Sequence, residues 1–224
     1  MKGGSSGSRV DDEIALLQRR LENSVPRPRR EERIIPPPLE EFFPGVLVNC
    51  WDASLNNTAF ADIIVRDGRI EVIDKGTIRP VTEERGYLGT WDKSLQLRGT
   101  LRWQDWRFNR ADHVVVEAPS VGGGHRTESS LIAGLRVYEM APDKVSMVSA
   151  THVSWVLTGQ ARLESHDRKQ AIRRALAHYI PGSDGRGWNE HIRDAVAAGL
   201  AHLWDLSQAP ETMDLVTADE GGAR

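Results

Sequence analysis

The stretch Val46–Asp52, with the sequence VLVNCWD, is an apolar run that ends in a carboxylate. Its length and its β-branched residues predict a buried strand. A carboxylate at the end of such a strand is costly unless a partner compensates its charge. A second run of the same kind, Val114–Glu117 (VVVE), also ends in a carboxylate. Asp52 and Glu117 therefore mark a candidate functional site.

The residues around the first stretch predict two further strands in hairpin order. The strand Thr58–Val65 is closed by Asp67-Gly68, a strong signal for a tight hairpin turn, and Ile70–Ile78 follows. Beyond these strands we expect, in order, a helix over Gly86–Asn109, a strand over His113–Glu117, a helix over Thr127–Met140, a strand over Val145–Val148, and helices over Ala150–Leu157, His166–Tyr179 and Glu190–Leu206. This order predicts an α/β fold with a mixed sheet, in which three antiparallel strands precede parallel strands and helices flank the sheet.

Length and composition bound the organisation of the chain. The 224 residues predict one domain with tails, or at most two small domains, and the domain proper is expected over residues 43–208. Residues 1–42 are expected to form a flexible tail with a short helix (Val10–Asn23) and a proline-rich linker, and residues 209–224 a C-terminal tail. The net charge of −3 restricts nucleic-acid binding to a local patch. The single cysteine and the absence of a long apolar run predict a cytoplasmic protein without a membrane partner.

The last predicted helix carries two more potential ligands. His191 and Asp194 are spaced i, i+3, so they point to the same side of the helix. An apolar stripe that includes Ile192 and Val196 faces the core, and Asn189 is a plausible N-cap. The small residues Ala195, Ala197, Ala198 and Gly199 allow close approach to the sheet. We therefore expect Asp194 near the strand ends.

The four residues Asp52, Glu117, His191 and Asp194 predict a metal site for phosphodiester hydrolysis. Hard cations such as Mg²⁺ prefer oxygen ligands, and two ions roughly 3.5–4 Å apart activate water and stabilise the leaving oxygen. Mg²⁺ is the expected cofactor, with two ions per site, and Mn²⁺ is expected to substitute. Asp52 would bridge both ions, and Glu117 and Asp194 would hold one each. His191 would act as a ligand, or as the group that orients or deprotonates the water.

The sequence from Gly45 to Leu206 resembles the RuvC family of Holliday-junction resolvases. The resemblance lies in the Asp52 and Glu117 strand ends, the loop and helix Gly124–Val137, the Thr158-Gly159 turn and the acidic last helix. It implies a ribonuclease-H-like fold and a homodimeric endonuclease that nicks four-way DNA junctions in pairs, leaving 5′-phosphates. The family's metal positions fall on Asp52, Glu117, His191 and Asp194. A chain this divergent is expected to be encoded by a phage. It is expected in the cytoplasm of a bacterial cell, either uninfected or infected by a phage.

The chain also departs from the family's pattern. Ser154 stands where the family places a basic residue before the Thr-Gly turn, and residues 120–126 (SVGGGHR) lack the family's wedge aromatic. DNA contacts are expected instead from five basic residues, Arg126, Arg168, Lys169, Arg173 and Arg174. Further positive charge on the first long helix comes from Arg98, Arg102, Arg107 and Arg110.

Structural interpretations of these residues remain open beside the functional ones. Asp52 would cap a turn, Glu117 would be an edge carboxylate, and Asp194 would sit favourably near the start of a helix. His202 is expected on a helix surface, and no Ser-His-Asp triad is expected. The competing functions are a less selective nuclease for forks and flaps, and a junction-binding protein without catalysis.

Overall fold

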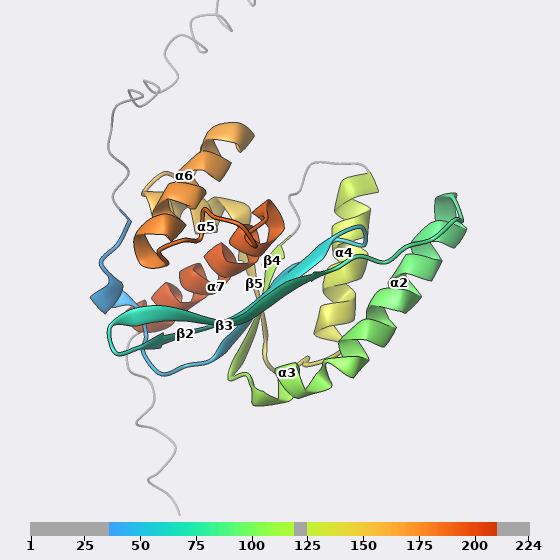
Figure 1. Cartoon of the computed structure of the whole chain (residues 1–224), viewed down its shortest axis with the longest axis horizontal. Coiled ribbons are helices and arrows are strands. Elements are labelled where there is room, and N and C mark those ends of the chain that lie inside the picture. Colours follow the sequence, from blue (N-terminus) through green and yellow to red (C-terminus); the bar gives the residue numbers. More distant parts are fainter. Residues whose placement is uncertain (1–35, 119–124, 210–224) are drawn as a thin grey trace, which may run out of the picture. The chain divides into compact units, whose positions relative to one another are not determined.

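The computed structural model describes residues 36–118 and 125–209 (Figure 1). The expected N-terminal helix, most of the proline-rich linker, the triple-glycine loop and the C-terminal tail from residue 210 lie outside the described residues. The elements follow in the order η1 (Leu39–Glu41), β1 (Val48–Asp52), β2 (Thr58–Arg66), β3 (Arg69–Ile78), α2 (Gly86–Trp103), α3 (Asp105–Arg110), β4 (His113–Ala118), α4 (His125–Tyr138), β5 (Val145–Ser149), α5 (Ala150–Thr158), α6 (Ser165–Tyr179) and α7 (Glu190–Gln208).

The strands form one five-stranded sheet in the order β3-β2-β1-β4-β5. β1 pairs with β2, and β2 with β3, in antiparallel fashion, whereas β4 is parallel to β1 and β5 is parallel to β4. The predicted mixed sheet is therefore confirmed. The hairpin turn is confirmed as well, because both Asp67 (φ 51°) and Gly68 (φ 68°) adopt the left-handed conformation that a tight hairpin turn of this kind needs.

Helices cover both faces of the sheet, with α5, α6 and α7 on one face and α2 and α4 on the other (Figure 1). Successive strand residues point to opposite faces, so Cys50 joins the core beneath α7, and Trp51 joins the core beneath α2. The α7 core uses the small residues that the sequence predicted for close approach, including Ala195 and Ala198. None of the helices in residues 36–118 and 125–209 is long and apolar enough to cross a membrane.

The prediction of one continuous helix over Gly86–Asn109 is wrong, because the structure has two helices there, α2 and α3. The chain turns at Gln104, whose N–H donates to Leu101 O (2.9 Å), and α3 begins one residue later. No proline or glycine marks this break. The turn allows Phe108 to enter the core, where its ring stacks on Trp51 with centroids 5.4 Å apart.

The change of direction also buries Arg107. Its guanidinium donates to Asp62 and, at 2.6 Å, to Asp74, and Arg110 reaches Asp62 as well. Asp62 is fully buried and also accepts from Asn49 at 2.6 Å. Arg107 was expected to add positive charge to the long helix for DNA contacts, but it is buried and its ion pairs with Asp62 and Asp74 hold it inside the fold.

The described chain already packs against the core before the predicted domain start at residue 43. Phe42 is buried and meets the Tyr179 ring edge-on, with centroids 5.2 Å apart. The Tyr179 hydroxyl donates to the carbonyl oxygen of Pro37. These contacts attach the end of the proline-rich segment to helix α6.

Candidate metal centre

Three carboxylates from three separate segments meet at one edge of the sheet. Asp52 ends β1, and Glu117 lies in the parallel neighbour β4, where the preceding residue pair in register is Trp51 and Val116. Asp194 reaches them from α7. One oxygen from each of the three carboxylates lies within 4.8 Å of the other two. The C-terminal ends of the parallel strands β1 and β4 lie on the same side of the sheet, so the fold itself brings Asp52 and Glu117 together.

The cluster is electrostatically strained. Burial, followed by the charges of Asp194 and Asp52, raises the pKa of Glu117 to about 8. Burial and the charge of Asp52 raise the pKa of Asp194 to about 6. Such carboxylates resist ionisation because they have little solvent and repel one another. A bound cation would reverse this effect, and three carboxylate oxygens are the donor set that Mg²⁺ or Mn²⁺ takes.

His191 lies beside the carboxylates rather than among them. Its Nδ1 atom is 2.6 Å from Oδ2 of Asp52, and this hydrogen bond raises the pKa of the imidazole. Within the described residues, the acidic set that converges on one point consists of Asp52, Glu117 and Asp194. The structure thus brings His191 to the predicted site through its contact with Asp52.

The start of α7 holds His191 and Asp194 in place. The side chain of Asn189 accepts a hydrogen bond from the N–H of Ile192 at 2.9 Å, which confirms the predicted N-cap. Ile192 is buried at this end of the helix. The capped and anchored first turn therefore directs the side chains of His191 and Asp194 toward the strand ends.

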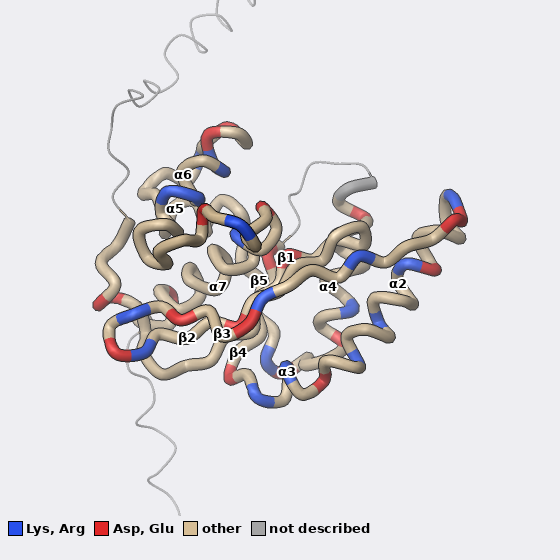
Figure 2. Tube along the Cα trace, viewed as in Figure 1, with Lys and Arg blue, Asp and Glu red and all other residues tan. Residues whose placement is uncertain are grey.

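Of the five predicted DNA-binding residues, Arg168 reaches the cluster. Its Nη1 atom is 3.4 Å from Oε1 of Glu117, and it lowers the pKa of Glu117 against the effect of burial. Lys169 pairs with Glu190, and Arg173 donates to the carbonyl of Asp184 at 3.0 Å. Arg174 is exposed on α6. The side chain of Arg126 lies outside the described residues, and Figure 2 shows basic and acidic residues interspersed along the rest of the chain.

Ser154 has a structural role. It is fully buried, and its hydroxyl donates to the carbonyl oxygen of Gln160 at 2.7 Å. Gly159 follows in the left-handed conformation (φ 70°), which confirms the turn after Thr158. A basic side chain at position 154 would not reach solvent, so this chain does not supply the basic group there.

Two further histidines, His202 and His152, make contacts that the sequence did not predict. His202 was expected on the surface and is instead buried, with its ring 4.9 Å from that of His113. Burial lowers the pKa of His202 to about 4. His152 binds the carboxylate of Asp205 at 2.8 Å on the opposite end of α7. Its sequence neighbours Ala201 and Leu203 are apolar and buried, and this apolar surrounding was the available signal for the burial of His202.

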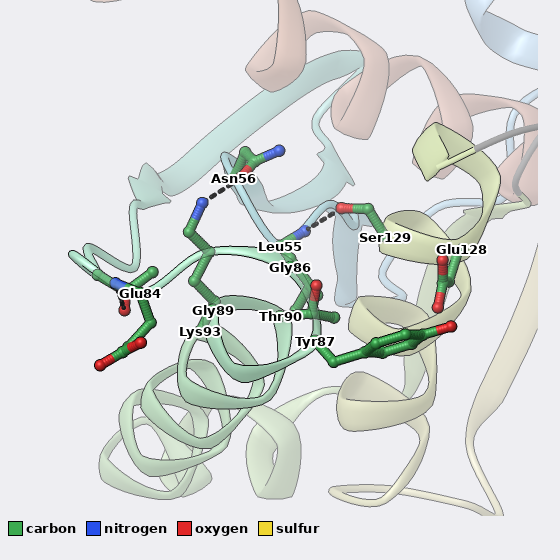
Figure 3. A pocket seen from close by; sticks show the side chains of 11 residues that line it. Leu55, Asn56, Glu84, Gly86, Tyr87, Gly89, Thr90, Lys93, Glu128 and Ser129 are labelled. Carbon is green, nitrogen blue, oxygen red and sulfur yellow. Dashed lines mark hydrogen bonds between the residues drawn. The ribbon is translucent and has the colours of Figure 1, made fainter.

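A hollow of about 360 Å³ lies beside the turn that follows Asp52 (Figure 3). Asn56, from that turn, accepts a hydrogen bond from Lys93 on α2 at 2.6 Å. Ser129, on α4, accepts from the N–H of Leu55 at 3.1 Å. None of the three clustered carboxylates lines this hollow, so it is not part of the candidate site.

The fold has clear counterparts among solved structures. The RuvC protein of Thermus thermophilus in complex with Holliday junction substrate matches 73% of this chain and 96% of its own, with a TM-score of 0.54 and 16% identity. Another structure of Thermus thermophilus RuvC matches 72% of this chain and 95% of its own, with a TM-score of 0.55 and 14% identity. The sequence matches no protein-family model and none of the curated proteins.

Proposed function

We propose, from the ribonuclease-H-like fold that this chain shares with solved resolvases, that the protein is a divalent-metal-dependent endonuclease that resolves four-way DNA junctions by paired nicks. One observation carries the proposal. Asp52 of β1, Glu117 of β4 and Asp194 of α7 each place one carboxylate oxygen within 4.8 Å of the other two. The Thermus thermophilus structure with Holliday junction substrate supports the choice of substrate class.

In this proposal Asp52, Glu117 and Asp194 hold divalent ions, Mg²⁺ or Mn²⁺. Two ions in such a site supply an activated water and stabilise the leaving oxygen. Asp52, at the end of the central strand β1, would be the central ligand of this set. Water attacks the phosphorus, the P–O3′ bond breaks, and the products are a 3′-hydroxyl and a 5′-phosphate. Arg168, beside Glu117, is placed to contact the phosphate that enters the site.

His191 is assigned one of two roles, either as the base that accepts a proton from the attacking water or as a ligand of a metal ion. Its Nδ1 atom is engaged by Asp52, so Nε2 is the atom available for either task. As a base, it would take the proton that the attacking water releases. As a ligand, it would complete the coordination around the ion at Asp52.

A broader nuclease is the second candidate, and two observations favour it. Ser154 is buried and supplies no basic contact, and residues 120–126 lack an aromatic wedge. An enzyme without these groups would act on forks and flaps as readily as on junctions.

The test uses a labelled four-way junction, a fork and a linear duplex, each with Mg²⁺, Mn²⁺ or chelator. Paired symmetric nicks confined to the junction are expected. Asp52→Asn should abolish cleavage while binding and folding persist, and Asp205→Asn, an acid paired with His152, is the matched control. Equal cleavage of fork and junction would select the broader nuclease. If the protein binds the junction but does not cleave it with either Mg²⁺ or Mn²⁺, it is a junction-binding protein without catalytic activity.

A further inference from the structure

The hollow beside the turn after Asp52 has the build of a site for a small group. Its volume of about 360 Å³ falls within the range of ligand pockets, roughly 300–1,000 Å³. Side chains from the turn, from α2 and from α4 line it, so three separate segments contribute to its walls (Figure 3). The chemistry assigned to the carboxylate cluster makes no use of this space, and its occupant is therefore a separate question.

The wall that the turn provides is held in place by both helices. Nζ of Lys93 on α2 donates to Oδ1 of Asn56 at 2.6 Å. Oγ of Ser129 on α4 accepts from the N–H of Leu55 at 3.1 Å. A group that enters the hollow would therefore meet side chains that are already positioned, which reduces the entropy lost on binding.

A second wall is formed by the loop before α2 and by the first turns of that helix. Position 89 has no room for a side chain, because a Cβ atom on Gly89 would lie 2.4 Å from the carbonyl oxygen of Glu84. The loop therefore lies directly against the helix, and Glu84 is part of the lining. Tyr87 also lines the hollow and is 87% exposed. Its ring thus presents an aromatic surface to whatever occupies the space.

The charges around the hollow favour a nucleobase over a phosphate. The charged side chains that line it are two carboxylates, Glu84 and Glu128, and one cation, Lys93, which already binds Asn56. This excess of negative charge repels a phosphate. A nucleobase is neutral, and its exocyclic amino group is a donor that carboxylate oxygens accept. Bases taken out of the stack are held in this manner, by hydrogen bonds to their edges and by stacking on aromatic side chains.

A DNA strand bound at the carboxylate cluster would reach the hollow. Asn56 follows Asp52 by four residues, so their Cα atoms lie at most about 14 Å apart. Stacked DNA advances about 3.4 Å per nucleotide along each strand. A strand with a phosphate at Asp52 therefore passes the hollow within roughly six nucleotides. Next to a branch point a base has fewer stacking and pairing partners, so it leaves the stack at a lower cost.

We propose that the hollow is a subsite for one unstacked nucleobase of the DNA substrate. Tyr87 stacks on the base, and Glu84 and Glu128 accept from its exocyclic amino group. This inference rests on the proposed function for its ligand, because DNA is the substrate proposed there, and it adds a base contact to the metal chemistry. Adenine, cytosine and guanine carry an exocyclic amino group and thymine does not, so the subsite disfavours thymine.

The test measures binding of the full chain to labelled four-way junctions by fluorescence anisotropy, in chelator so that metal-dependent cleavage does not interfere. Each junction of a series carries one abasic nucleotide, placed at successive positions within six nucleotides of the branch. At one position the wild type should bind roughly 5- to 150-fold more weakly, the loss expected when one base–aromatic stack is removed. Thymine at that position should support weaker binding than cytosine.

Tyr87→Ala should bind the intact junction as weakly as the wild type binds that abasic junction. The abasic nucleotide should then weaken binding by this variant less than twofold further, because the two changes remove the same contact. Tyr87→Phe keeps the ring and should retain the wild-type affinity. Trp103→Ala is the matched control, because Trp103 lies on the same helix, is 88% exposed and does not line the hollow. It should keep both the affinity and the dependence on the abasic position.

Two results would overturn the subsite. One is a series of junctions in which every abasic position, or none, weakens binding by the wild type. The other is a loss in Tyr87→Ala that multiplies with the loss from the abasic nucleotide, because the ring and the base would then act independently.

Cleavage with Mg²⁺ or Mn²⁺ separates this inference from the proposed function. A protein that shows the base dependence through Tyr87 but cleaves neither junction nor fork would refute the nuclease and leave the subsite standing. A protein that cleaves junctions without that dependence would support the nuclease and refute the subsite. A protein that binds none of these DNAs would refute both.

Discussion

A Cβ atom added to Gly199 would lie 2.1 Å from Sγ of Cys50. Helix α7 therefore contacts the Cys50 side chain of β1 so closely that position 199 has no room for a side chain of its own. The same helix carries Asp194 five residues and His191 eight residues earlier, and β1 carries Asp52 two residues after Cys50. The spacing of the candidate metal ligands thus depends on a contact within the core.

Gly199→Ala is expected to destabilise the protein, because the new methyl group also meets Cδ1 of Ile63 at 2.7 Å. Overpacking of this kind costs about 1–3 kcal/mol, which urea unfolding would measure. Gly99→Ala on α2 is the matched control, since a Cβ there meets nothing within 4 Å. It should stabilise the helix by roughly 0.5–1 kcal/mol. Equal effects at both positions would refute the close-contact explanation.

Arg107→Met should lower the free energy of unfolding by about 3–5 kcal/mol, because it leaves the buried Asp62 carboxylate without its main partner. Arg102→Met, at an exposed position of α2, should change it by less than about 0.5 kcal/mol. Combining Arg107→Met with Asp62→Asn should recover part of the loss, because the unpaired charge is then removed. Denaturant unfolding of the three variants tests this, and full stability of Arg107→Met alone would contradict it.

The metal-free protein should lose stability as the pH rises. Glu117, with a pKa of about 8, and Asp194, with a pKa of about 6, retain protons in the folded state that the unfolded chain releases near its ordinary carboxyl pKa values. Between those values and about pH 8 the folded state binds more protons, so the free energy of unfolding falls with pH, by a few kcal/mol.

Unfolding in chelator at pH 5, 6.5 and 8 measures this dependence. Glu117→Gln should flatten it, whereas Glu139→Gln, at a half-exposed pair with Arg136, should not. Mg²⁺ should restore stability most at pH 8, because its ligands must be ionised. A stability that rises from pH 5 to pH 8 in the metal-free protein would be the contrary result.

Arg168→Ala should reduce the rate of DNA cleavage about 10²-fold, as the loss of a positioned cation near a reacting phosphate commonly does. Arg174→Ala, on the exposed side of the same helix, should reduce the rate less than threefold. Arg168→Lys should retain partial activity because it keeps the charge without the forked geometry. Single-turnover cleavage of a labelled junction is the measurement. Equal losses in the Arg168 and Arg174 variants would indicate general electrostatic attraction only.

Local sequence patterns were sufficient to predict the positions of the strands. Alternation and apolar runs predicted β1, β2, β3, β4 and β5 to within two residues, and Asp67-Gly68 predicted the hairpin turn. The arrangement of Asp52, Glu117 and Asp194 followed from placing acids at strand ends and on one helix. The strands and the turn depend on short-range geometry, which the sequence encodes directly, whereas the proximity of the three acids was inferred from the rule that parallel strands end on the same side of a sheet.

The features that the sequence did not reveal depend on distant partners. Arg107 is buried because Asp62 and Asp74, 45 and 33 residues away, meet it across the sheet. The break at Gln104 follows from that burial and from the packing of Phe108 on Trp51. His202 is buried against His113 from another element. No single-sequence pattern specifies pairings over these separations.

The two apolar cores share no residue, because the sheet lies between them. Trp51 and Cys50 are neighbours in the chain, yet each belongs to a different core. A substitution beneath α2 and a substitution beneath α7 can therefore be made separately, with little coupling expected between them. Evolution can then modify one layer while the acids on the other remain fixed. Such a partition would allow chains with almost no sequence identity to keep the same arrangement of carboxylates.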